Sequence, residues 1–202
     1  MHRFLLWLIA ALALSDAVAR AAPPVADPEW PCRQRLVPTL TAATFWNGTL
    51  PAVVGEWRAE PRASAEVAVL APRDLPIEEG VEKLNHFADG LNDDERKKLL
   101  PEVFTGIVDE INRQRGEVIA RIKDLARRQR DLGATAAKVT AELRDAQTKA
   151  DDAKSLEEIR QRRDFIIRSF DETERTMRYA CEVPVDLEAR LGNYARAIEA
   201  RL

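Results

Sequence analysis

The chain has 202 residues, of which 46% are apolar, 32% are charged and only 6% are aromatic. A chain of this length and composition corresponds to one domain with a modest core, rich in helices. Its 31 basic and 34 acidic side chains give a net charge of −3, which excludes the basic excess typical of a dedicated nucleic-acid-binding protein.

The amino terminus has the three parts of a signal peptide. Arg3 supplies a positive charge, residues 4–14 form an unbroken apolar run, and residues 17–19 are Ala-Val-Ala, the form of a cleavage site. This run is shorter than the roughly 20 residues that span a bilayer. We therefore expect residues 1–19 to be removed and the protein to be exported to a bacterial periplasm, without stable membrane insertion. An uncleaved anchor is the alternative.

Cysteine usage predicts one disulfide. The chain contains two cysteines, Cys32 and Cys181, and an oxidising compartment favours their pairing. The bridge would stabilise the fold by roughly 5 kcal/mol at most, because it closes a long loop of the unfolded chain. The alternatives are two free thiols or a redox pair, although redox dithiols usually lie close together as C-x-x-C.

Residues 20–76 form a belt rich in proline and tryptophan. Nine of the eleven prolines lie there, together with Trp30, Trp46 and Trp57. Proline removes a backbone donor and clashes with the preceding turn, so we predict extended, turn-rich structure laid over helices, with one short helix or strand around residues 65–70. Trp46 and Trp57 are candidate partner-binding residues, because exposed tryptophans often anchor interfaces. Buried tryptophans that cover the helices are the alternative.

A helical domain is predicted over residues 77–202. Pro76 stands at the start of a first amphipathic helix, a position that suits its fixed backbone angle. Asn92 and Glu95 then have the spacing of a capping box and begin a short second helix, which we expect to end before Pro101.

The chain contains no proline between Pro101 and Pro184, and this stretch carries a heptad seam. The apolar residues at every seventh position are Phe104, Ile111, Val118, Leu125, Leu132, Val139 and Ala146. A second seam runs over residues 156–177 after a turn near residues 151–154. We therefore predict an all-α fold dominated by a long antiparallel, coiled-coil-like helical hairpin over about 101–181, with shorter flanking helices.

Two polar residues interrupt the first seam. Arg115 and Gln129 occupy companion positions that are otherwise mostly apolar. Polar groups at such positions cost stability and can set register or partner choice, so both are candidate partner-binding residues. Exposure at a frayed seam is the alternative. A helix that continues through Gly133 in the same seam does so at a cost of about 1 kcal/mol.

Few side chains of the mature chain offer catalytic or ligand chemistry. His86 is its only histidine, the eight glycines are isolated, and no metal-ligand spacing occurs. Residues 113–130 are basic, but an acidic block at 142–158 can meet them across a hairpin, and they lack aromatic residues that would stack on bases. An anionic partner, such as lipid headgroups or a cell-wall polymer, is the alternative. We expect no cofactor, no metal and no nucleic-acid partner, and a role in binding; an enzyme is the alternative.

One segment resembles a group of other proteins. Residues 27–32, Asp-Pro-Glu-Trp-Pro-Cys, followed by Gln34, resemble the start of the mature chain in secreted proteobacterial proteins of uncharacterised activity, which continue into arginine-rich helices. Residues 179–184, Tyr-Ala-Cys-Glu-Val-Pro, resemble a second piece of these proteins. The resemblance implies export and a disulfide-tied helical architecture, and it implies no activity.

Two classes of function remain. The first is an interaction, scaffold or accessory protein that contacts an envelope protein, with self-association through the helical seam as a further option. The second is a ligand-binding or enzymatic accessory protein with a tryptophan-lined pocket. Buried tryptophans favour the first class, whereas a pocket with convergent polar groups beside them favours the second.

Overall fold

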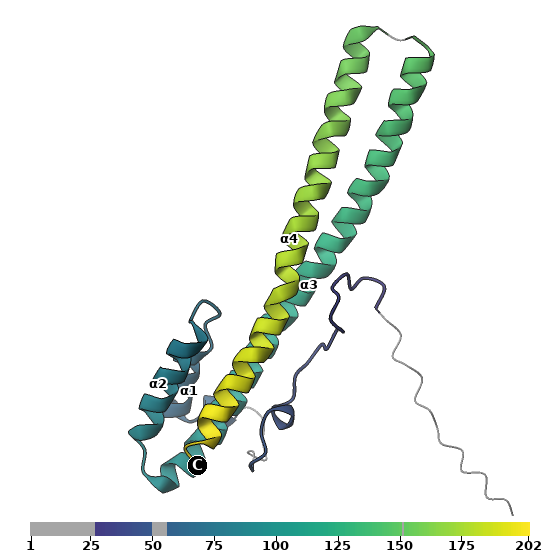
Figure 1. Ribbon diagram of the computed structural model, residues 1–202. Coiled ribbons are helices and arrows are strands. Elements are labelled where there is room, and N and C mark those ends of the chain that lie inside the picture. The colour runs from purple at the N-terminus through teal and green to yellow at the C-terminus, as the bar shows by residue number, and fades with distance from the viewer. Residues whose placement is uncertain (1–26, 50–55, 151) are drawn as a thin grey trace, which may run out of the picture.

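A computed structural model describes residues 27–49, 56–150 and 152–202, and within these ranges the chain is helical and contains no strand (Figure 1). The predicted all-α class is confirmed, while the predicted signal peptide lies outside the described residues. The helices are the short 3-10 helices η1 (Ala42–Thr44) and η2 (Glu56–Arg58) and the α-helices α1 (Pro61–Leu70), α2 (Ile77–Asp89), α3 (Asp93–Thr148) and α4 (Ala153–Glu199).

Helices α3 and α4 form the predicted antiparallel hairpin (Figure 1). Helix α3 continues through Gly133 and, with 56 residues, is about 84 Å long. The turn lies close to its predicted place, where Asp152 caps α4 by accepting hydrogen bonds from the backbone N–H groups of Lys154 and Ser155 at 3.0 and 3.1 Å. The two helices therefore make one continuous rod.

The predicted hairpin limits of about 101–181 are wrong, because both helices continue through a proline. Helix α3 begins with the predicted capping box of Asn92 and Glu95 and passes through Pro101, and α4 passes through Pro184. A proline inside a helix costs about 3 kcal/mol. Both prolines are themselves buried, and burial of their apolar surface offsets part of the local cost.

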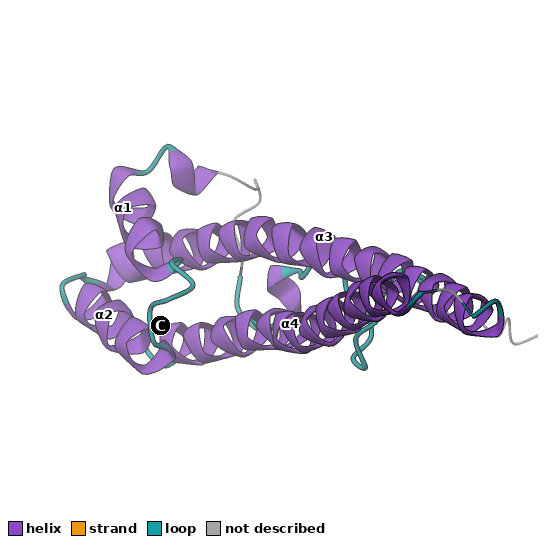
Figure 2. Ribbon diagram, turned by 90° about the horizontal axis from the view of Figure 1, so that it is seen from above, coloured by secondary structure: helices purple, strands orange, loops and turns teal. Residues whose placement is uncertain are grey.

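The main core lies at the open end of the hairpin, which we call the base. Helix α1 packs on α3 and α2 packs on α4, so both short helices lie at this end (Figure 2). Gly80 of α2 permits a close approach to α4, because a Cβ atom there would lie 1.9 Å from the Tyr194 hydroxyl oxygen. The largest fully buried side chains include Tyr194, Phe104, Leu70, Leu84, Leu100 and Ile107.

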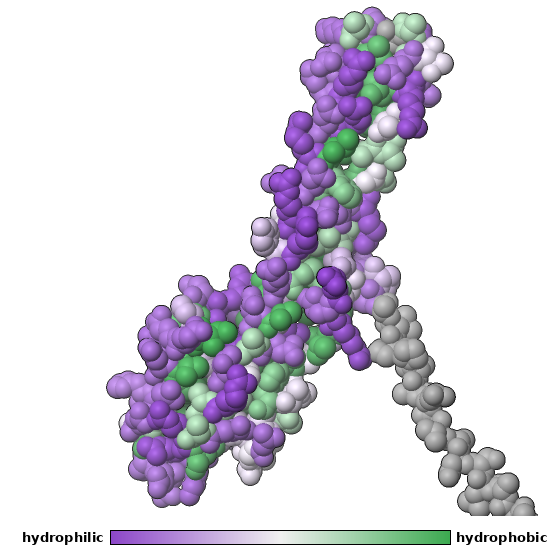
Figure 3. Space-filling view, in the orientation of Figure 1, coloured by the Kyte–Doolittle hydropathy of each residue, from purple (hydrophilic) through white to green (hydrophobic). Residues whose placement is uncertain are grey.

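The closed end of the hairpin, residues 131–148 of α3 and 153–170 of α4, forms what we call the arm. Its buried apolar side chains all lie on the seam between the two helices, and they are Val139, Leu143, Ala146 and Ile166. Apolar surface shows along this part of the rod mainly as a narrow line between hydrophilic edges (Figure 3). The arm is therefore only two helices thick where it projects from the base.

Residues 27–49, the described part of the predicted belt, lie beside the hairpin as an extended strap with turns (Figure 1). The side-chain amide of Asn112 on α3 donates to the backbone carbonyl of Leu40 and accepts from its N–H, each at 2.8 Å. The short helix predicted around residues 65–70 is α1, which begins earlier, at Pro61. Strap and helices share one core.

Candidate functional site

The two tryptophans predicted as partner anchors are buried. Trp46 and Trp57 are only 4% and 8% exposed. Trp46 stacks on Phe104 with ring centroids 5.1 Å apart, and Trp57 donates its indole N–H to the Asp109 carboxylate at 3.0 Å. The prediction that these side chains offer exposed anchors is wrong, because both rings fill the core beside α3.

The two polar seam residues differ in their environment. Arg115 is buried, and its guanidinium donates to the backbone carbonyl of Pro184 at 2.6 Å and to that of Val37 at 2.7 Å. Burial lowers the pKa of Arg115, and the nearby Glu188 carboxylate opposes this shift. Arg115 thus joins α3, α4 and the strap, whereas Gln129 lies half-buried on the seam.

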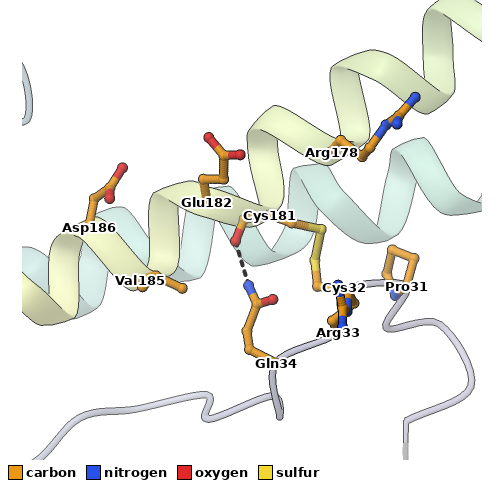
Figure 4. A pocket seen from close by; sticks show the side chains of 9 residues that line it. All are labelled: Pro31, Cys32, Arg33, Gln34, Arg178, Cys181, Glu182, Val185 and Asp186. Carbon is orange, nitrogen blue, oxygen red and sulfur yellow. Dashed lines mark hydrogen bonds between the residues drawn. A yellow bond between two sulfur atoms is a disulfide. The ribbon is translucent and has the colours of Figure 1, made fainter.

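The predicted disulfide joins the strap to α4 (Figure 4). The Cα atoms of Cys32 and Cys181 lie 5.6 Å apart, and Gln34 donates a side-chain N–H to the Cys181 carbonyl oxygen. A shallow, open hollow of about 400 Å³ lies around this bridge. Its charged lining consists of Arg33, Arg178, Glu182 and Asp186. Because positive and negative groups balance, the hollow does not select an ion of either sign.

A second hollow, of about 460 Å³, lies between α1 and α3 and includes Trp57 in its lining. Val67 and Pro72 contribute apolar surface, Ser64 and Gln114 contribute polar groups, and Glu110 and Arg113 contribute one charge of each sign. The Gln114 amide donates to a backbone carbonyl of the α1 end at 2.9 Å, and its own buried oxygen has no partner among the described residues. This hollow therefore combines a tryptophan with polar groups, as the second functional class requires.

The two most exposed large apolar side chains of α4 belong to the lining of neither hollow. Phe165 is 65% exposed and Tyr179 is 72% exposed. They are separated by two heptads, about four helical turns, so they lie on the same side of α4. Neither residue was predicted as a site, because both lie outside the heptad seam; their shared heptad position on another face of the helix was the available signal.

Among the described residues of the base, titratable groups do not assemble into a recognisable catalytic centre. His86 is exposed on α2. Glu66 on α1 is half-buried, and burial raises the pKa of its carboxyl group, while the nearby charges of His86 and Lys83 act in the opposite direction. In the part of the chain that the structure describes, no three His, Cys, Asp or Glu side chains gather as metal ligands.

None of the described helices is long and apolar enough to cross a bilayer. The chain matches no protein-family model, and no curated protein or solved structure is significantly similar to it.

Proposed function

We propose that the protein is an exported scaffold or interaction protein of the cell envelope, acting in the periplasm. The observation that carries this proposal is the arm, which projects from the base and buries apolar side chains only along its own seam. The arm contributes no side chain to the main core. We therefore infer that it serves to contact other molecules and not to stabilise the base. A projecting helical rod can hold a binding surface at a distance from the base, and this suits a scaffold better than an enzyme.

The contacts at the root of the arm support this role, because they fix its direction relative to the base. The Cys32–Cys181 disulfide and the Arg115 hydrogen bonds tie the strap to the hairpin below the arm. Along the arm itself, Arg162 of α4 pairs with Glu142 of α3. A rod held in this way presents its outer residues at a fixed distance from the base, as a spacer or docking element requires.

Export is tested by sequencing the amino terminus of the protein isolated from its host. We expect the mature chain to begin at Arg20 and to fractionate with the periplasm, because residues 1–19 have the form of a signal peptide. A soluble cytoplasmic protein that retains Met1 would contradict the proposed location.

Partner binding is tested by placing a photo-reactive amino acid at Lys138 or Ala141, two exposed positions on the α3 side of the arm, in the native host. We expect a defined adduct with a protein other than this chain. Val69 is the matched control, because it is exposed on α1 of the base. Adducts of equal yield at the arm and at Val69 would argue against the arm as a docking element. The absence of adducts at the arm positions would argue against it as well.

The hollow that includes Trp57 supports a second candidate function, the binding of a small ligand with both apolar and polar groups. Native mass spectrometry of protein purified from its own periplasm tests this candidate. A bound small molecule that is lost on Ala68→Trp, a change that fills the lining of the hollow, would favour ligand binding. Ligand-free protein would leave the scaffold role as the better explanation.

A further inference from the structure

The exposed side of α4 carries a run of five residues whose side-chain types read the same in both directions. From Phe165 the residues follow as aromatic, arginine, glutamate, arginine and aromatic, at steps of three, four, three and four. Such steps keep side chains on one face of a helix. The members of this α4 stripe are Phe165, Arg168, Glu172, Arg175 and Tyr179, and all five are exposed.

The fold itself does not use these side chains. Within residues 27–49, 56–150 and 152–202, the side chains of Arg168, Glu172 and Arg175 form no ion pair within 4.0 Å and no hydrogen bond, whereas Glu174 beside them pairs with Arg178 at 3.6 Å. The seam residues of α4 face α3 and are occupied within the chain. Any self-association must therefore use another face, and the stripe is the exposed face of α4 that carries aromatic rings.

We propose that a second copy of this chain packs across the α4 stripe, antiparallel to the first, with a two-fold axis close to Glu172. A two-fold interface brings the same patch together from both subunits, so the patch must be complementary to itself. Antiparallel pairing about residue 172 places Phe165 of each copy opposite Tyr179 of the other. The two aromatic residues lie seven residues to either side of Glu172, and the arginines lie four residues before it and three after it, so the residue types match in such a pairing.

Charge complementarity supports the same register. At the axis Glu172 of each copy lies opposite Glu172 of the other, and the arginines of both copies lie about one helical turn to either side, so four arginines surround the two glutamates. The aromatic pairs lie at the two ends of the contact, about 21 Å apart along the helix. Aromatic and arginine side chains are those most enriched at the energetic centres of interfaces. An unrelated partner protein could bind a patch without this pattern. A second copy requires a patch that is complementary to itself, and the pattern has this property.

This inference goes beyond the proposed envelope role and is tested on purified mature protein with its disulfide intact, where no other protein is present. Sedimentation equilibrium should show a reversible dimer. Replacing both aromatics, as Phe165→Ser with Tyr179→Ser, should raise the dimer dissociation constant by more than about 30-fold. Ile167→Ser is the matched control, because Ile167 is 41% exposed on α4 but lies off the stripe, and it should leave the constant unchanged.

Charge reversal tests the two-fold register independently of the aromatic rings. Glu172→Arg alone should abolish the dimer, because six arginines would then meet at its centre. Combining Arg168→Glu, Glu172→Arg and Arg175→Glu should restore it, since the reversed pattern is again self-complementary. Glu172→Cys should form a covalent dimer under mild oxidation, whereas Ile167→Cys should not.

A monomer at all concentrations, or a dimer that the stripe variants leave unchanged, would overturn the inference. Neither result bears on the arm cross-links to other proteins, so failure of this inference and failure of the proposed function are distinguishable.

Discussion

Arg115 is a buried cation whose hydrogen-bond partners are two backbone carbonyls from different parts of the chain. Hydrogen bonds that involve a charged group contribute about 1.5–3 kcal/mol each. Arg115 has no carboxylate among these partners, so its hydrogen bonds must offset the cost of its own burial. A residue that seemed suited to partner choice therefore acts as an internal link between helices and strap.

We expect Arg115→Met to lower the free energy of unfolding by about 2 kcal/mol or more, because two carbonyls lose their charged donor. The strap should also become more accessible to protease, since Arg115 binds Val37 within it. Urea unfolding and limited proteolysis measure the two effects. Arg113→Met is the control at an exposed position of the same helix, and an equal loss in both variants would contradict this account.

Glu66 should make the stability of the fold depend on pH. Its pKa is raised in the folded protein because burial disfavours the charged carboxylate. Between its unfolded and folded pKa values the native state binds more protons, so the stability contribution of Glu66 falls as pH rises through that window. Glu66→Gln should therefore be more stable than the natural protein at neutral pH.

The Glu66 prediction is checked by unfolding both proteins over a pH series. The advantage of the glutamine variant should disappear in acid, below both pKa values, where Glu66 is neutral in both states. An advantage that stays constant across the series would show that charge burial is not its cause.

At the scale of elements, glycine determines how closely α2 approaches α4. A Cβ atom at Gly80 would lie 1.9 Å from the hydroxyl oxygen of Tyr194 and 2.8 Å from its ring carbon Cζ. Tyr194 is fully buried, and its hydroxyl contacts the Leu70 carbonyl at 3.2 Å, so it has little freedom to move away. The small residue at position 80 is therefore required by packing.

Two glycine substitutions should have opposite effects. Gly80→Ala should destabilise the protein by about 1–3 kcal/mol through overpacking. Gly116→Ala in α3 should stabilise it by up to about 1 kcal/mol, because nothing lies within 4 Å of a Cβ there and alanine favours the helix. Thermal unfolding of both variants measures the difference, and destabilisation of equal size would refute the packing argument.

The hairpin shows what could be predicted from the sequence and what could not. Heptad spacing predicted two paired helices and their turn, because burial along a seam repeats with the helix. The limits of about 101–181 were wrong because the helix-breaking propensity of Pro101 and Pro184 was weighed without the tertiary burial around these residues. Phe165 and Tyr179 were missed because a search for the seam selects only residues that face the partner helix.

At the scale of the whole molecule, one covalent bridge joins the strap to the middle of α4. Cys32 and Cys181 are 149 residues apart in the sequence. A bridge over such a loop removes many conformations from the unfolded chain. The disulfide therefore raises the free energy of unfolding of the entire fold and not only that of the strap.

Replacing both cysteines by serine should lower the free energy of unfolding by at most roughly 5 kcal/mol, the chain-entropy limit for a loop of this size. Denaturant unfolding of the oxidised protein and the double variant measures the loss. The Ile167→Ser protein serves as a control for a mild surface change. Equal stability of oxidised and serine-substituted protein would show that the bridge adds nothing to the fold.

The bridge also makes part of the polypeptide a closed ring, and the tip of the arm lies within that ring. A single backbone cut at residues 149–152 would open the ring without releasing either piece. Cys32 lies before the cut and Cys181 after it, so the disulfide still joins the two pieces. Protein nicked there should migrate as one species without reductant and as two fragments with it. The tip could thus be cleaved by a protease while the molecule stays covalently in one piece.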